Sequence, residues 1–414
     1  MTQNNPLSTI YSRTALGIVG SLIFFSPMAR GAVHPWAYTL IQIGVILSAM
    51  CLVLESLTQP KINIVWAPMG WPIVGVILLS LVSFAASEYK PFALEGLFMM
   101  LIYGTAYLTT HACIRTEKEH RILVHVIVLT AVFLCLIGLL KRFDILTPGW
   151  WSYPDVGLYH GANAVSGPYV NRNHLAGFLE MVIPFAMALI FTRHRTREQE
   201  LGLMLVALLL VTTQAFTLSR GGWISTITAL LFMVSVYLTQ NKTTGKKTLA
   251  AVMIGFLVIS LFVLSSLPAV ERIITLTQQE HEDNLSGRMR CWKGTIKMIK
   301  ENFLFGTGPD TFTEAYPAWQ VPGPQVLRRK AHNDYLHYLS ETGIFLIPVG
   351  AVTLYCFFRI GFKHFHSPSR QERGFTLAAM AGVLAILIHS LSDANLNIPA
   401  NAFVFIVLAG IIRE

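Results

Sequence analysis

Long apolar segments are the feature that most constrains how this chain folds. Twelve of them occur among its 414 residues, at about 14–29, 35–56, 68–87, 94–114, 121–141, 173–192, 200–218, 222–240, 248–267, 334–360, 375–391 and 400–412. A helix that spans a bilayer needs about 20 mostly apolar residues. Only 13% of the residues are charged, about half the share of roughly 25% that is usual in globular proteins. The pattern predicts an all-α polytopic membrane protein with about 12 transmembrane helices, forming a single integral membrane domain over residues 1–414.

The distribution of basic residues predicts which helix ends face the cytoplasm. If the N-terminus is inside, sixteen Lys and Arg and seven Asp and Glu fall on the cytoplasmic side, and their difference equals the whole net charge of +9. Cytoplasmic connections of membrane proteins carry an excess of Lys and Arg. We therefore expect both termini in the cytoplasm, and the positive charge requires no nucleic-acid partner.

The two longest connections, at 142–172 and 268–333, then lie on the outer face. The second separates spans nine and ten, and its segment 284–305 has the spacing of an amphipathic helix. The cytoplasmic connections are short, and no Walker or Rossmann glycine pattern occurs. We expect any chemistry on the outer face, where a substrate must carry its own activation.

Two arginines of the outer face are candidate ligands for an anion. Arg220 lies in the short turn Ser219-Arg220-Gly221-Gly222, where glycine lets the backbone approach a ligand closely and arginine can bind a phosphate through two hydrogen bonds. Arg288 precedes the apolar stripe of the 284–305 helix, where its side chain can also reach an anionic ligand. The alternative for Arg220 is contact with a lipid headgroup.

His332 is the strongest candidate for a general base, because an imidazole titrates near neutral pH. It lies in the run Arg328-Arg329-Lys330-Ala331-His332-Asn333-Asp334-Tyr335, directly before the tenth span. Asn333, His337 and Glu341 follow at intervals of four, and we expect this polar stripe to face a cavity. The alternative is a histidine at the membrane interface without a chemical role.

The run Asn171-Arg172-Asn173-His174 at the outer start of the sixth span adds further candidates for substrate binding, namely Arg172, Asn173 and His174. Its alternative is a helix cap at the membrane interface. Glu180, two turns farther on, is expected to have a structural partner. Neither H-E-x-x-H nor a paired-acid motif occurs, and Glu280-His281-Glu282-Asp283 is most simply a solvated run. We expect no metal site and no cofactor.

Together these motifs resemble those of the O-antigen ligase and polymerase superfamily. His332-Asn333 followed after nine residues by Gly343 resembles the histidine motif, although Leu346 departs from the small or polar residue common there. Arg220 with Ile224 resembles the arginine motif, which usually has leucine in the second place. A third match, to the outer-loop arginine region of the superfamily, is formed by Ser286-Gly287-Arg288 with Trp292, followed by Gly306-Thr307-Gly308-Pro309. The similarity covers roughly residues 165–360.

The resemblance implies a C-type glycosyltransferase-like fold in the bacterial inner membrane, with its active site on the periplasmic face. It implies transfer of a glycan from undecaprenyl diphosphate to lipid A–core, with inversion and without a metal. His332 would be the base, Arg220 and Arg288 would hold the diphosphate, and Asn333 and His337 would be further candidates for substrate binding.

Two alternatives stay open. One is a polysaccharide polymerase or a protein-directed oligosaccharyltransferase of the same superfamily, because the outer-loop pattern does not select an acceptor. The other is a transporter or lipid flippase, for which Glu180, His125, Glu341 and His389 are the relevant ionisable residues. A transporter would be expected to show repeated halves, and the sequence has no internal repeat.

Overall fold

The computed structural model describes residues 6–59, 67–143, 145–146, 164–192, 196–240, 255, 285–322, 327–365 and 367–412. Helices dominate these residues, and none of the described residues forms a β-strand. The predicted all-α membrane fold is therefore confirmed. The predicted ninth span, 248–267, lies outside the described residues except for residue 255, and so do parts of both predicted outer connections.

Eight of the described helices are long and apolar enough to cross a membrane. They are α1 (Pro6–Met28), α2 (Pro35–Leu57), α4 (Lys90–Cys113), α5 (Glu117–Arg142), α6 (Arg172–Phe191), α7 (Arg197–Phe216), α14 (Leu346–His364) and α15 (Arg370–His389). Two shorter apolar helices are α3 (Gly70–Ala86) and α16 (Pro399–Ile411). The others are η1 (Arg30–Ala32), α8 (Arg220–Gln240), α11 (Leu285–Glu301), α12 (Phe312–Ala315), η2 (Tyr316–Trp319) and α13 (Asp334–Thr342). The total of twelve spans stays a prediction.

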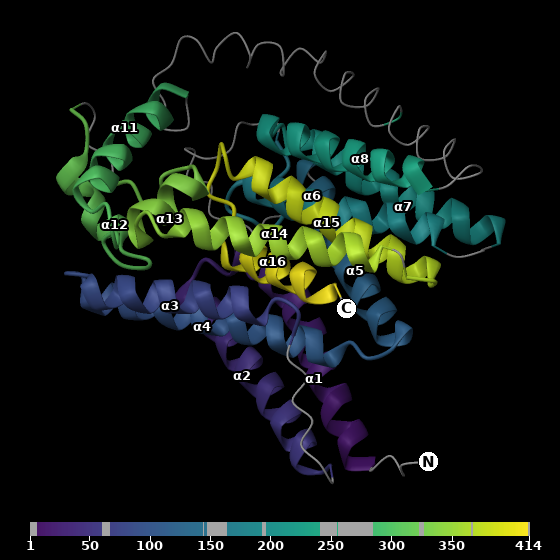
Figure 1. Cartoon of the computed structure of the whole chain (residues 1–414). Helices are drawn as coiled ribbons and strands as arrows, with labels where there is room; N and C mark the ends of the chain where they lie inside the picture. Colours follow the sequence, from purple (N-terminus) through teal and green to yellow (C-terminus); the bar gives the residue numbers. More distant parts are fainter. Residues whose placement is uncertain are drawn as a thin grey trace.

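Helix α6 forms the centre of the bundle, and α15 and α8 pack against it (Figure 1). From Leu175 to Leu189 every side chain of α6 is buried. A helix that is apolar on all sides lies in a protein core or in a membrane, and here the neighbouring helices cover it. Because α6 begins at Arg172, its central position brings the polar run 171–174 to one end of the core.

The segment predicted as one tenth span, 334–360, is instead two helices, and this prediction was wrong. Helix α13 ends at Thr342, Gly343 has a left-handed backbone with φ +75°, and α14 begins at Leu346. A side chain at Gly343 would overlap the backbone of Leu304. Hydropathy and helical spacing do not detect this break, because its cause is close contact with a distant part of the chain.

Polar contacts at one end of the bundle join helix ends that the charge pattern assigns to one side of the membrane. Glu55 of α2 accepts hydrogen bonds from Ser8 of α1 (3.1 Å) and from Arg115, which follows α4 (2.6 Å). Near the start of α15, Gln371 donates to the backbone carbonyl of Glu117 in α5 (2.9 Å). The grouping agrees with the predicted topology, and which end faces the cytoplasm stays a prediction.

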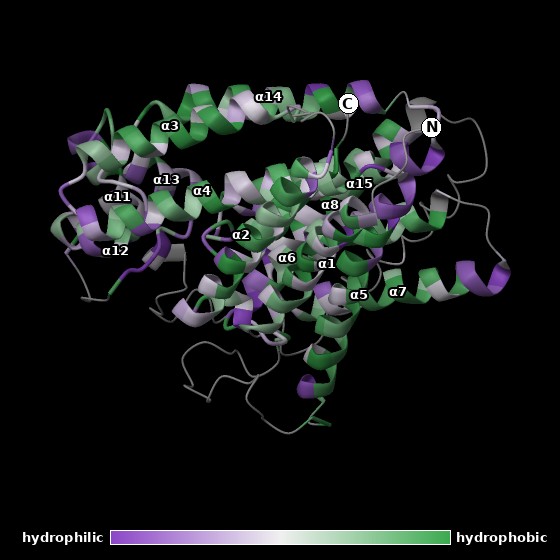
Figure 2. Ribbon diagram, turned by 90° about the horizontal axis from the view of Figure 1, so that it is seen from below, coloured by the Kyte–Doolittle hydropathy of each residue, from purple (hydrophilic) through white to green (hydrophobic). Residues whose placement is uncertain are grey.

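The other end, called here the α13 end, carries α11, α12, η2 and α13 (Figure 1). Figure 2 shows more hydrophilic ribbon around these helices than along α3 and α14. The predicted amphipathic helix is present as α11. Its buried face includes Cys291, Thr295 and Met298, which pack toward Phe312 and Tyr316. The predicted apolar stripe stays partly exposed: Met289, Ile296 and Phe303 are each 42–50% exposed.

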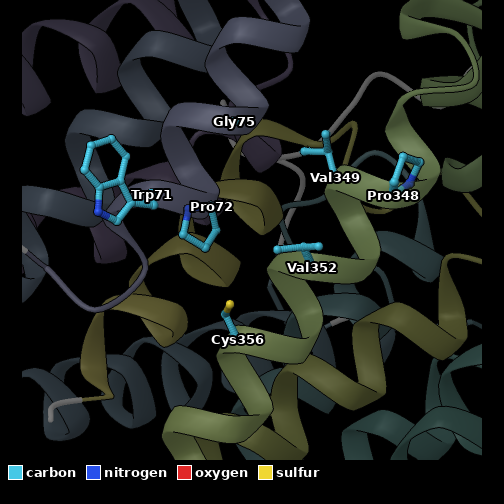
Figure 3. Close-up of a pocket in the computed structure, with 7 residues that line it drawn as sticks. All are labelled: Trp71, Pro72, Gly75, Pro348, Val349, Val352 and Cys356. Atoms are coloured by element: carbon cyan, nitrogen blue, oxygen red, sulfur yellow. The ribbon is translucent and has the colours of Figure 1, made fainter.

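An apolar pocket lies between α3 and α14 (Figure 3). The residues that line it are Trp71, Pro72, Gly75, Pro348, Val349, Val352 and Cys356. None of them carries a charge or belongs to the predicted site. The candidate chemistry must therefore be sought at the α13 end.

Candidate functional site

Asp393 is the centre of a polar cluster at the α13 end. It lies in the connection between α15 and α16, and its side chain is 1% exposed. Its Oδ1 accepts hydrogen bonds from Nδ1 of His332 (3.1 Å) and from the backbone N–H of Ala394 (2.8 Å). Its Oδ2 accepts from Nδ2 of Asn173 (2.6 Å) and from the guanidinium of Arg288 (3.4 Å). One carboxylate therefore joins α6, α11 and the segment before α13.

The carboxyl of Asp393 is ionised. Burial alone would raise the pKa of Asp393, but the charge of Arg288 and the hydrogen bond from His332 hold this pKa well below its ordinary value. A carboxylate that accepts several hydrogen bonds beside a cation strongly favours the charged form. The cluster thus contains a permanent negative charge directly behind His332.

His332 is held in one orientation by this carboxylate. Its backbone is left-handed, with φ +52°, which is uncommon for a residue with a side chain. Because an ionised Asp393 accepts from Nδ1, that nitrogen carries the proton and Nε2 is the nitrogen able to accept one. The side chain is 22% exposed. The arrangement has the geometry of an oriented general base.

Arg288 lies in the first turn of α11 and reaches back to the same connection. One guanidinium nitrogen, Nη1, donates to the backbone carbonyl of Ser392, and Nη2 contacts Asp393. The side chain is 15% exposed. A guanidinium has five N–H groups, so these two contacts leave further donors for an anionic ligand.

Arg220 is the first residue of α8, and its side chain is exposed. The next residue, Gly221, packs directly on the same connection: a Cβ there would lie 2.6 Å from the ring of His389 and 2.8 Å from Oγ of Ser392. Ser392 is the residue whose carbonyl binds Arg288. The structure therefore brings Arg288, His332 and the start of α8, which carries Arg220, to one short segment, residues 389–393.

A family model described as O-Antigen ligase matches residues 204–349. The matched segment contains Arg220, Arg288 and His332, and the fold brings Arg288, His332 and the start of α8 together. This part of the chain is similar to the O-antigen ligase-like superfamily. No curated protein matches the chain. The resemblance inferred from the motifs is confirmed at the level of the superfamily.

The superfamily segment does not include the polar start of α6, yet that start contributes to the cluster. Asn171 caps α6 by accepting from the backbone N–H of Asn173 (2.8 Å), and Asn173 donates to Asp393. His174 and Arg172 are half-buried beside them. The helix cap expected as the alternative is present at Asn171, and Asn173 contacts the cluster. Substrate binding by Arg172, Asn173 and His174 stays a prediction.

Asn333 and His337 have structural contacts. Asn333 caps α13 by accepting from the N–H of Leu336 (3.0 Å), and its Nδ2 donates to the carbonyl of Leu391 (2.9 Å). His337 is buried, lies 3.3 Å from Glu341 and is 4.7 Å from Phe312 between ring centroids. The expected polar stripe facing a cavity was wrong, because a second layer of protein covers it.

In that second layer, Phe312 packs on His337 and the Gly306–Pro309 segment packs on α13 at Ser340 and Glu341. Oγ of Ser87 donates to the carbonyl of Thr307 (2.5 Å), and the N–H of Gly308 donates to the carbonyl of Glu341 (2.9 Å). A Cβ at Gly306 would overlap the backbone of Glu341. These glycines permit close contact between the segment and α13, which begins two residues after His332.

Asp334, two residues after His332, ties the chain around His332 to the segment that carries Asp393. Its carboxylate accepts from Ser390 (2.7 Å), from the backbone N–H of Leu396 (2.9 Å) and from Asn397 (2.7 Å). Nearby, Lys330 donates to the carbonyl of Asn397 (2.8 Å), and burial lowers the pKa of Lys330 to about 8. The two chain segments that carry the base and its acid partner are thereby tied together.

Sequence reasoning did not select Asp393. Its signal was weak: one acid in the short polar run Ser390-Leu391-Ser392-Asp393-Ala394-Asn395 between two apolar spans. Glu180 was expected to have a structural partner, and it has one in His389. Among the described residues no group of three or more His, Cys, Asp or Glu side chains is placed to hold a metal ion.

Proposed function

We propose that the protein is an O-antigen ligase-type glycosyltransferase that moves a glycan from undecaprenyl diphosphate to lipid A–core. The observation that carries this proposal is the hydrogen bond between His332 and the ionised Asp393, with Arg288 on the same carboxylate and Arg220 at the adjoining helix start. An oriented base beside two arginines suits a reaction in which a hydroxyl loses its proton and a diphosphate departs.

The reaction proceeds by a single displacement. The hydroxyl oxygen of the acceptor forms a bond to the anomeric carbon as the bond from that carbon to the diphosphate oxygen breaks. The proton passes to Nε2 of His332, and the diphosphate leaves with the electron pair. Attack from the face opposite the leaving group inverts the anomeric configuration.

The arginines stabilise the charge that develops on the diphosphate. Arginine binds phosphate oxygens through two parallel hydrogen bonds and keeps its charge at every physiological pH. Such preorganised donors act most strongly where water is largely excluded. Arg220 and Arg288 therefore supply the electrophilic assistance, and the reaction is expected to need no metal.

The proposal includes a site on the periplasmic face of the bacterial inner membrane, with both termini in the cytoplasm. The support is the excess of basic residues on the opposite helix ends and the joining of Glu55 with Arg115 there. A substrate activated as a diphosphate suits a compartment without nucleotide sugars. The lipid bilayer is the remaining partner, and the proposal includes no nucleic acid.

The test is transfer by the purified protein in lipid vesicles. A polyprenyl-diphosphate glycan is supplied with one of three acceptors: lipid A–core, the growing glycan itself, or a protein. Transfer to lipid A–core that persists in EDTA supports the ligase. Transfer only to the glycan or only to the protein identifies the polymerase or the oligosaccharyltransferase, and loss of transfer in EDTA contradicts the metal-independent mechanism.

A further inference from the structure

A buried acid–histidine pair lies directly beneath the site and is not used by the mechanism above. Both carboxylate oxygens of Glu180 in α6 lie within 3.0–3.1 Å of Nδ1 of His389 at the end of α15. The two side chains are 0% and 1% exposed. Ionisable groups inside a membrane protein are costly and usually have a function.

The ring of His389 contacts the start of α8 on its other side. Its Nε2 lies 3.5 Å from Oγ of Ser219, the outer limit for a hydrogen bond, and this Oγ accepts from the backbone N–H of Gly222 (3.3 Å). Ser219 therefore caps the helix that begins at Arg220. Gly221 lies against the same ring, and no space is left there for a Cβ atom.

The backbone of His389 closes the turn that leads to Asp393. Its carbonyl accepts from the N–H groups of Ser392 (2.9 Å) and Asp393 (3.1 Å). Ser392 is in turn the acceptor for Arg288. One residue thus contacts the helix start that carries Arg220 and the turn that binds Arg288 and His332.

The polar atoms of this chain of contacts satisfy one another. Nδ1 of His389 contacts the carboxylate of Glu180, its Nε2 lies 3.5 Å from Oγ of Ser219, and that oxygen accepts from the N–H of Gly222. A buried network in which every donor has an acceptor is rigid, because moving one member leaves another without a partner. The register of α8 against the 389–393 turn is therefore fixed from within the core.

We propose that Glu180, His389 and Ser219 are positioning residues that set the distance between Arg220 and Arg288 for binding the donor diphosphate. The inference rests on the proposed function and deepens it. Loss of any member lets the start of α8 shift relative to Ser392, which separates the two arginines without removing either. The expected defect is weaker donor binding, with the acceptor site intact.

The experiment compares Ser219→Ala with Ser369→Ala. Both remove a serine that caps a helix, because Ser369 caps α15 by accepting from the N–H of Glu372 (3.3 Å). Ser369 lies at the start of α15, whereas Ser219 contacts His389 at the end of α15. Only Ser219 is therefore one of the three proposed positioning residues. We expect Ser219→Ala to raise KM for the donor about tenfold, a loss of 1.4 kcal/mol, with an unchanged KM for the acceptor. Ser369→Ala should leave both KM values unchanged.

His389 provides a second pair of variants. His389→Ala should raise the donor KM at least as much as Ser219→Ala does. His389→Gln keeps a side-chain amide, whose oxygen can accept and whose nitrogen can donate a hydrogen bond toward Ser219, so it should recover part of the loss. A purely structural role would lower the amount of folded protein and the melting temperature, without separating the donor KM from the acceptor KM.

Binding of undecaprenyl diphosphate, measured without any acceptor, separates the two proposals. If the wild type transfers no glycan to any acceptor, the proposed function fails. If the wild type binds the diphosphate and Ser219→Ala and His389→Ala bind it equally well, the positioning role is overturned. Donor and acceptor KM values that rise together would overturn it too.

Discussion

At the scale of single residues, the carboxylate of Asp393 joins His332, Arg288 and Asn173. The pKa of Asp393 is held low by Arg288 and His332 against the effect of burial. A lowered pKa means that the ionic contacts of Asp393 stabilise the fold at any pH above the unfolded value of about 4. That contribution is lost only as the pH falls through the lower folded value, so it is fully present at neutral pH.

Asp393→Asn tests this role. The amide keeps the shape but removes the charge that orients His332, so we expect kcat to fall about 10²-fold or more. Asp310→Asn is the matched control, because Asp310 is exposed at the same end and asparagine tolerates its left-handed backbone, φ +58°. Steady-state transfer rates measure both, and an unchanged kcat in Asp393→Asn would remove Asp393 from the site.

Arg220→Lys tests the shape of the cation rather than its charge. Lysine keeps the positive charge but cannot make two parallel hydrogen bonds to a phosphate. We expect a clear rise in the donor KM, measured by titration with the polyprenyl-diphosphate glycan. Arg290→Lys, at a half-buried position of α11, is the control. A wild-type donor KM in Arg220→Lys would argue against bidentate binding.

At the scale of elements, the break between α13 and α14 holds His332 in place. Gly343 closes α13 with a left-handed backbone against Leu304, and Gly306 packs on Glu341. The sequence predicted one span here because the run after Gly343 is strongly apolar and the mixed segment 334–342 was read as its beginning. Whether a glycine breaks a helix depends on what packs against it. Here the packing residue is Leu304, about 40 residues before Gly343 in the chain.

Gly343→Ala should therefore destabilise the protein, while Gly350→Ala should not. The first change forces a side chain into a left-handed backbone and into Leu304, at a cost of about 1–3 kcal/mol. The second lies within α14 with nothing within 4 Å of the added Cβ, and alanine favours helix over glycine. Thermal unfolding in detergent compares them, and equal melting temperatures would contradict the packing described.

At the scale of the whole molecule, the prediction from sequence succeeded where it rested on membrane physics. Apolar segments gave ten of the described helices nearly as they are, because a bilayer requires long apolar helices. Arg220, Arg288 and His332 were selected individually from residue type and position, and their roles stay predictions. The contacts of Asp393 with Arg288 and His332, and the packing of Phe312 on His337, depend on tertiary structure that spacing does not encode.

The predicted topology has its own test in single cysteines introduced into a background without the five native ones. A cysteine at Arg329, which is exposed at the α13 end, should react in intact cells with a reagent that cannot cross the inner membrane. A cysteine at Gln371, near Glu117 at the other end, should react only after the membrane is opened. The reverse result would place the site in the cytoplasm.

The most direct test of the central claim is the rate of glycan transfer by His332→Ala in a single turnover. The wild type and His125→Ala, a histidine of α5 bonded to the carbonyl of Arg121 (2.7 Å), serve as references. Loss of a general base should slow transfer about 10²- to 10⁴-fold, with insertion, folding and donor binding retained. Transfer at the wild-type rate by a folded His332→Ala protein would contradict the account.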